Sequence, residues 1–268
     1  MINYTSADFD AQRTPDYTLL ARLGLDEQVL AVVDEAWRLK FAMAYGPGEM
    51  DGNVWDRFPL GFSQVKLAVA DAGHLFLPAE VFDEAYTQTY FSYLPNDGLV
   101  NSGISDISSL GIKLLHQTHR LGMESLIARF PQAHSYPTIQ ALLCSVADYG
   151  KKSEDLTFVL DKQSSRITLC VFKTGRFIYS NDFELYSITD LDYYLLSLLE
   201  HLGLADEHPQ IYLSGDITMN DAIHQLLLTY GKTVLFADSG LLTGVAIPAE
   251  LQQHQHRLLT LLGLRLCG

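Results

Sequence analysis

The 268-residue chain has few basic side chains and few cysteines. Its 18 Lys and Arg oppose 32 Asp and Glu, so the formal net charge is −14. Tight binding of nucleic acid needs clustered Lys and Arg that release counterions from phosphate, and this charge excludes nucleic acid as the main partner. The 3 cysteines form no Cys-x-x-Cys pair and no Cys/His metal pattern, a usage typical of a reducing compartment.

Long apolar runs are also absent. No stretch approaches the ~20 apolar residues that a membrane helix needs. Residues 1–15 are polar and lack the basic start and apolar segment of a secretory signal. We therefore expect a cytoplasmic protein with no membrane partner.

Short catalytic motifs are missing as well. The chain has no complete P-loop, because Gly231-Lys232-Thr233 is preceded by Leu226 where the motif needs a glycine, and it has no Gly-x-Ser-x-Gly nucleophile elbow. A ribonuclease-H-type nuclease needs several carboxylates around a pair of metal ions. The matching strands offer only Asp161, with Asp34 at the end of another strand, so the sequence argues against a nuclease.

Apolar residues make up 48% of the chain, enough for a sizeable core. In the C-terminal half, apolar runs and turn residues predict three antiparallel strands, then a helix, a strand, a helix and a strand. This β-β-β-α-β-α-β order is that of the ribonuclease-H-like unit. The predicted strands are 156–160, 166–172, 177–183, 210–213 and 233–236, and the helices lie within 187–203 and 220–230.

The first of these helices has a clear apolar face. Ser187 or Thr189 can cap its start, and Gly203 is well placed to end it. Leucines recur at helical spacing, which predicts that this face packs against the sheet. These leucines are Leu191, Leu195, Leu198, Leu199 and Leu202.

The N-terminal half predicts a less regular version of the same pattern. We expect a helix from Pro78 through Phe91, because proline suits a first helical position, and a loop in the Ser-rich stretch 102–109. The predicted fold is α/β with two ribonuclease-H-like lobes, residues 1–152 and 153–268. The predicted strands are 17–23, 28–33, 39–45, 65–69, 75–77 and 110–115, with further helices at 122–130 and 138–149.

Two segments carry a family resemblance. Leu77–Phe82 contains a Pro-x-x-x-Phe element, and the stretch from Leu156 to Ile217 ends in Ile211-Tyr212-Leu213-Ser214-Gly215-Asp216. Together they resemble the bacterial family known as domain of unknown function 3822 (DUF3822), and the resemblance extends from about Asp16 to the end of the chain. The family is associated with an actin-like ATPase fold, which the resemblance implies here. It implies no substrate.

Actin-like ATPases hold ATP with two hairpin loops and a glycine-rich turn, whose glycines let backbone N–H groups approach phosphate. The resemblance places the first hairpin at 22–27, where Gly24 fits but Arg22 replaces the expected acid. The second hairpin is 161–165, where Asp161 and Ser164 remain but Gln163 replaces a glycine. The turn at 214–216 keeps one glycine, Gly215. We interpret these loops as degenerate, and ordinary hairpin turns remain the simplest explanation of them.

Two histidine pairs have a spacing that could bring two imidazoles near one metal ion. His116-x-x-His119 has no third ligand nearby in the sequence, so it is typical of a polar junction. His254-x-His256 lies in a Gln-rich run that predicts a solvated helix face. We therefore predict no metal site.

Most of the clustered aromatic residues are expected to pack in the core, and those that exceed what one helix face can bury would mark a protein interface. Tyr86, Tyr90 and Tyr93 crowd one predicted helix and Tyr193-Tyr194 another, and aromatic residues are enriched at protein contacts.

The favoured function is accordingly a non-catalytic scaffold that binds a protein or a second copy of itself, without a cofactor. One alternative is a diverged ATP-binding protein or weak ATPase that holds ATP with Mg²⁺ in the cleft between the lobes, through Gly24, Asp161 and Gly215. Another is an enzyme that uses this cleft for a different small molecule.

Overall fold

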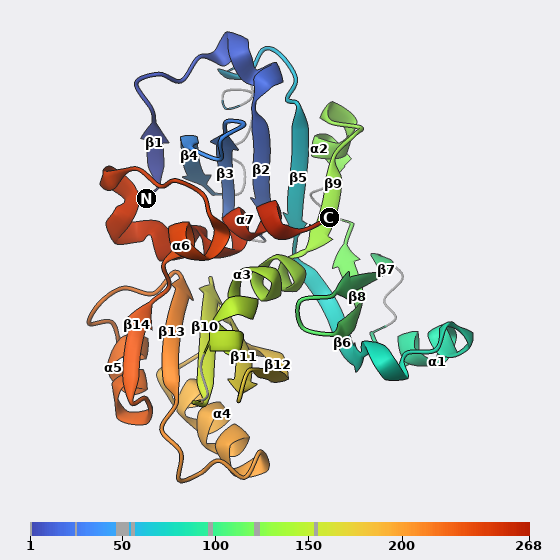
Figure 1. The fold of residues 1–268 in the computed structure, drawn as a ribbon, viewed down its shortest axis with the longest axis vertical. Coiled ribbons are helices and arrows are strands. Elements are labelled where there is room, and N and C mark those ends of the chain that lie inside the picture. The colour runs from blue at the N-terminus through green and yellow to red at the C-terminus, as the bar shows by residue number, and fades with distance from the viewer. Residues whose placement is uncertain are drawn as a thin grey trace. The chain divides into compact units, whose positions relative to one another are not determined.

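The computed structural model describes residues 2–24, 26–46, 54, 57–95, 99–120, 124–152 and 155–268. The chain forms two compact units, drawn as a ribbon in Figure 1. Unit 1 consists of Met1–Ser145, Thr243–Gln253 and Thr260–Gly268, and unit 2 of Val146–Leu242 and His254–Leu259. The chain passes from unit 1 to unit 2 within helix α3 (Thr138–Lys152). The expected division into lobes 1–152 and 153–268 stays a prediction.

The main sheet of unit 1 has the strand order β1-β4-β3-β2-β5-β9. Strands β2, β3 and β4 form an antiparallel meander, and β5 joins β2 in parallel. These strands are near-continuous apolar runs because both faces of the sheet are buried. The predicted meander is thereby confirmed. The strands are β1 (Asn3–Thr5), β2 (Thr18–Leu23), β3 (Gln28–Val33), β4 (Leu39–Tyr45), β5 (Gln64–Val69) and β9 (His134–Pro137).

A second sheet in unit 1 has the order β6-β8-β7 and corrects two predictions. Residues 102–107 of the Ser-rich stretch expected to be a loop belong to strand β7 (Val100–Ile107), which pairs along its length with β8 (Ile112–His119), and only Ser108 and Ser109 lie in a turn. Its polar side chains fit a strand because most of them are exposed at the edge of this sheet. The expected helix from Pro78 is also wrong, since Pro78 ends strand β6 (Asp71–Pro78).

Short turns replace that predicted helix. Ala79–Val81 and Glu84–Tyr86 are single 3₁₀ turns, and only α1 (Thr87–Phe91) is α-helical. The Asp83 carboxylate accepts a hydrogen bond from the Ala85 N–H at 2.9 Å. This cap starts a new turn and interrupts the helix.

The remaining helices of unit 1 include α2 (Glu124–Arg129) and α7 (Leu259–Gly263), which is followed by a 3₁₀ turn at Leu264–Leu266. A side chain at Gly263 would collide with the Ser145 hydroxyl and the Ala141 carbonyl oxygen of α3. Glycine is therefore needed here so that the C-terminal segment can approach α3 closely.

Unit 2 contains a sheet of order β12-β11-β10-β13-β14. Strands β10, β11 and β12 are antiparallel, and β13 and β14 continue the sheet in parallel through helices. The predicted β-β-β-α-β-α-β order is confirmed. The elements are β10 (Thr157–Gln163), β11 (Arg166–Lys173), β12 (Arg176–Glu184), α4 (Ile188–His201), β13 (Gln210–Gly215), α5 (Ala222–Tyr230), β14 (Thr233–Phe236) and α6 (Ser239–Thr243), and the 3₁₀ segment Ala249–Leu258 runs across both units.

Helix α4 has the predicted cap and the predicted face. The Asp190 carboxylate accepts a hydrogen bond from the Ser187 N–H at 2.7 Å, as in a capping box. Gly203 follows the helix with a φ of +66°, the left-handed conformation that ends many helices. The leucines buried beneath the helix are Leu191, Leu195, Leu198 and Leu199, with Leu202 half-buried.

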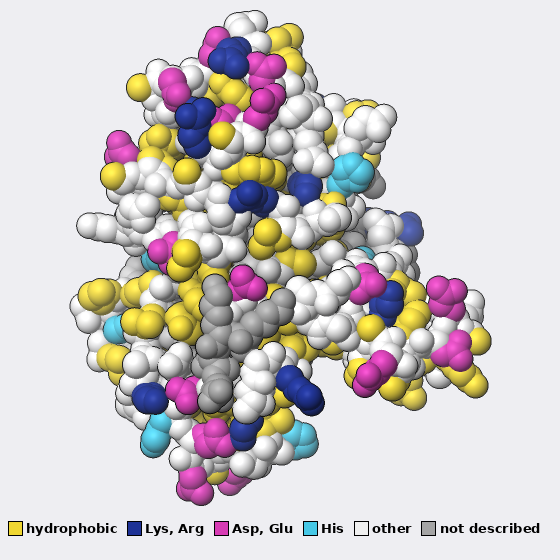
Figure 2. Space-filling model, in the orientation of Figure 1, with side chains coloured by type: hydrophobic (Ala, Val, Ile, Leu, Met, Phe, Trp, Pro, Cys, Tyr) yellow, Lys and Arg dark blue, Asp and Glu magenta, His cyan; other side chains and the backbone are white. Residues whose placement is uncertain are grey.

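No helix among the described residues is long and apolar enough to cross a membrane. On the face drawn in Figure 2, Lys and Arg side chains lie scattered among acidic ones.

Candidate functional site

The first predicted loop joins β2 to β3 in unit 1. The side chain of Arg22 is buried, and its guanidinium forms an ion pair with the Glu27 carboxylate at 3.1 Å. A Cβ atom on Gly24 would lie 2.5 Å from the Glu27 carbonyl oxygen. The tight backbone of this hairpin therefore requires glycine at position 24, and the ion pair with Glu27 holds the Arg22 side chain in place.

The second loop joins β10 to β11 in unit 2. Asp161 is only 2% exposed, and its carboxylate accepts a hydrogen bond from the Gln163 side-chain amide at 2.6 Å. Ser164 is exposed and has a φ of +55°, in the left-handed region. Gln163 replaces the glycine that phosphate binding would favour, and its amide binds the neighbouring acid.

The third loop follows β13, and Gly215 is its key residue. Gly215 has a φ of +76° and is paired with Lys162 of β10. A side chain there would collide with the Lys162 carbonyl oxygen, which also accepts a hydrogen bond from the Asp216 N–H at 2.8 Å. Close contact between neighbouring strands thus requires this glycine.

The C-terminal segment of unit 2, residues 254–259, packs on the same loop. The Ser214 hydroxyl donates to the His256 carbonyl oxygen at 2.9 Å, and His256 Nε2 donates to the Ile217 carbonyl oxygen at 3.0 Å. Burial lowers the pKa of His256. The prediction that this histidine lies on a solvated face is therefore wrong, because it fills the space beside Ser214 and Phe236.

Asp216 completes this local network. Its carboxylate lies 3.1 Å from the Arg257 guanidinium and 4.0 Å from the Lys162 ammonium group. The structure brings Asp161 and Gly215 together on adjacent strands, whereas Arg22 and Gly24 belong to unit 1. Binding of a nucleotide by these residues stays a prediction.

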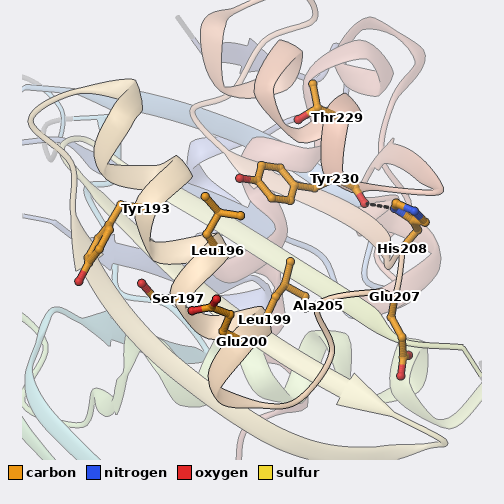
Figure 3. A pocket seen from close by; sticks show the side chains of 10 residues that line it. All are labelled: Tyr193, Leu196, Ser197, Leu199, Glu200, Ala205, Glu207, His208, Thr229 and Tyr230. Carbon is orange, nitrogen blue, oxygen red and sulfur yellow. Dashed lines mark hydrogen bonds between the residues drawn. The ribbon is translucent and has the colours of Figure 1, made fainter.

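A groove in unit 2 was not found from the sequence. It has a volume of about 560 Å³ and lies between α4, α5 and the loop that leads to β13. Figure 3 shows its lining, in which Tyr193 and Leu196 come from α4 and Tyr230 from α5. His208 Nδ1 donates to the Tyr230 carbonyl oxygen at 3.3 Å and joins the loop to α5.

The groove combines apolar and acidic side chains. Leu199 is buried at its base, whereas Leu196 is 52% exposed and Tyr193 is 65% exposed. Glu200 and Glu207 also line it, and Glu207 forms an ion pair with Lys173 at 2.7 Å. The signal in the sequence was the presence of Tyr193 and Leu196 outside the core face of α4.

The His116 imidazole lies between two strands of the β6-β8-β7 sheet. It is paired with His74 on one side and with Gly103 on the other, and Ser105 Oγ lies 3.2 Å from its Nε2. Burial, aided by His74, lowers the pKa of His116 to about 4. Among the described residues, no group of three or more His, Cys, Asp or Glu side chains could hold a metal ion.

We expect acid to weaken the fold through His116. The folded-state pKa is lowered, so the unfolded chain binds the proton first and stability falls as the pH drops from about 6.5 towards about 4. From about pH 7 to about pH 5 the loss attributable to His116 is about 2 kcal/mol. Urea denaturation at both pH values should show a smaller loss for His116→Gln than for wild type. Ser105→Ala, which keeps the imidazole, should retain the wild-type loss, and an unchanged loss in His116→Gln would contradict the assignment.

Solved structures identify the class of fold. A Bacteroides thetaiotaomicron protein with an actin-like ATPase fold and unknown function matches with a TM-score of 0.76 and 15% identity, over 97% of this chain and 99% of that one. A chain from the PilM–PilN type IV pilus biogenesis complex matches with a TM-score of 0.65 and 14% identity, over 93% and 97% of the two chains. No curated protein matches significantly. The predicted actin-like ATPase fold is thereby confirmed.

The family follows from the sequence match. The model of the family described as "Protein of unknown function (DUF3822)" matches residues 57–234. The chain belongs to the DUF3822 family.

Proposed function

We propose that this protein is a non-catalytic, protein-binding module whose nucleotide loops have degenerated. The observation that carries the proposal is that side chains of the three loops are bound by their own neighbours. Arg22 pairs with Glu27, and Gln163 donates to Asp161. A phosphate group would have to displace these partners.

The local charges also oppose a polyphosphate. Asp26 and Glu27 follow Gly24 in the first hairpin, and because Glu27 already pairs with Arg22, the hairpin adds no net positive charge that would attract a phosphate. In the third loop, the Asp216 carboxylate pairs with Arg257 at 3.1 Å and lies 4.0 Å from Lys162, so a phosphate approaching these two cations would also meet a carboxylate.

Binding of a protein is supported by the surface and by a structural neighbour. Tyr86, Tyr93 and Tyr193 are all largely exposed, and exposed aromatic side chains are typical of protein contacts. One structure with a similar fold belongs to a protein complex, that of PilM and PilN.

The alternative is a diverged ATP-binding protein, and one observation favours it. Asp161 is a buried carboxylate at the end of a central strand, beside the glycine turn of Gly215. An acid in this place could act on a nucleotide through Mg²⁺.

Calorimetry with ATP separates the two functions. We expect no heat of binding with ATP, with or without Mg²⁺, and no rise in the melting temperature, which a ligand specific for the native state would produce. Asp161→Ala and the matched control Asp155→Ala, at an exposed position two residues before the same strand, should behave like wild type in this assay.

Two results would contradict the proposal. Micromolar binding that needs Mg²⁺ and disappears in Asp161→Ala but not in Asp155→Ala would establish the ATP-binding alternative. Binding without Mg²⁺ that disappears in Arg22→Ala would indicate a metal-free phosphate site, since Arg pairs well with phosphate oxygens.

A further inference from the structure

We propose that the groove between α4 and α5 is the docking site for an amphipathic helix of a partner protein, one that carries Lys or Arg beside its apolar stripe. This inference rests on the proposed function, because it names the surface and the chemistry through which the module binds.

The shape of the groove favours a helix as its occupant. Tyr193, Leu196 and Glu200 follow one another at i, i+3 and i+7 along α4, and all three line the groove. Side chains at this spacing form a single stripe on a helix. A stripe beside a second helix, α5, forms the kind of groove in which an amphipathic helix lays its apolar face.

Burial explains why this surface is available. The core face of α4 is already filled by leucines such as Leu195, which is fully buried. Leu196 and Tyr193 contribute nothing comparable to that core, because more than half of each side chain is exposed. Large apolar side chains clustered in a groove mark binding surfaces more often than scattered ones do.

Charge decides the chemistry of the partner. Glu200 and Glu207 both line the groove. Glu207 pairs with Lys173, whereas Glu200 forms no ion pair with any of the residues that the structure describes. Asp206 is exposed in the adjoining loop, and the whole chain carries a net charge of −14. Complementary charges steer association and reject partners of like charge, so the partner helix carries basic residues at its flanks.

The test uses a fluorescein-labelled peptide of Leu and Lys, as long as α4, with Leu at i, i+3, i+4 and i+7. Fluorescence anisotropy should give a dissociation constant below about 100 µM with the full chain. The same peptide with Glu in place of Lys should not bind. Leu196→Asp should weaken binding at least about tenfold, because it places a charge on the apolar wall.

Matched controls test whether binding is local. Leu241→Asp introduces the same charge on α6, at a leucine that is 75% exposed and outside the groove, and should leave the affinity unchanged. Glu200→Lys should weaken binding, whereas Glu250→Lys, at an exposed glutamate elsewhere, should have a much smaller effect.

Three results would overturn the inference. They are absence of binding to wild type at about 1 mM peptide, equal weakening by Leu196→Asp and Leu241→Asp, and an unchanged affinity in Leu196→Asp. The last two would leave a protein-binding role standing at another surface. The ATP experiment tests that role separately, so failure of the groove and failure of the proposed function are distinguishable.

Discussion

Replacing Leu195 with Ala is expected to lower the free energy of unfolding by ~2–5 kcal/mol. Leu195 is fully buried between α4 and the sheet of unit 2, among Leu160, Leu169 and Leu213 of the same core cluster. Truncation removes apolar contacts and leaves a cavity that the packed sheet cannot fill.

The neighbouring residue provides a matched control. Leu196→Ala makes the same chemical change one position along α4, at a side chain that points into the open groove. Its cost should stay within about 1 kcal/mol. Urea denaturation followed by circular dichroism compares the two variants. Equal losses would mean that the face of α4 has been assigned incorrectly.

The α4 face could be predicted because its signals are local. The capping residues Ser187 and Asp190, the leucine spacing and Gly203 all lie within one segment, and each agrees with the others. The same holds for the hairpin between β11 and β12, where Thr174 and Gly175 both have positive φ values that suit a tight two-residue turn.

The errors arose where local preference and pairing disagree. In β7 the serines indicated a loop, but pairing with the apolar strand β8 decides the structure. At Pro78 the proline suited a helix start, but it pairs with Ile112 as the last residue of β6. Edge strands with polar side chains give a weak periodic signal, so such strands are easily missed.

The sequence identified the residues of the candidate loops, but it identified only some of the residues that form hydrogen bonds with them. Gln163 lies two residues from Asp161, so their contact is local. His256 and Ile217 are 39 residues apart, and nothing in the Gln-rich run around His256 indicates that it returns to β13. Contacts at such separation depend on the topology of the whole unit, which periodicity does not specify.

The groove shows the same limit. Tyr193 is recognisable in the sequence as part of an aromatic pair, but Glu207, His208 and Tyr230 join it only after α4 and α5 pack together. The sequence therefore indicated that some aromatic side chains could exceed what the core buries, but not which residues would surround them.

Replacing Gly215 with Ala is expected to lower the free energy of unfolding by roughly 2–5 kcal/mol. A loss of this size would mean that the fold itself requires the glycine, without any bound phosphate. Two penalties combine at this position. The positive φ of +76° is unfavourable for any residue with a Cβ atom. The new methyl group would also meet the Lys162 carbonyl oxygen, so β10 and β13 would have to separate where they are paired.

Gly203 separates the two penalties. It has a similar φ of +66°, and a Cβ atom there would meet nothing within 4 Å, so Gly203→Ala carries the conformational cost alone, about 1 kcal/mol. Urea denaturation of both variants without any nucleotide should show a clearly larger loss for Gly215→Ala. Equal losses would contradict the steric role of Gly215. Packing of β10 against β13 would then not explain the glycine at position 215. Close approach of a bound phosphate would remain as a physical reason for it.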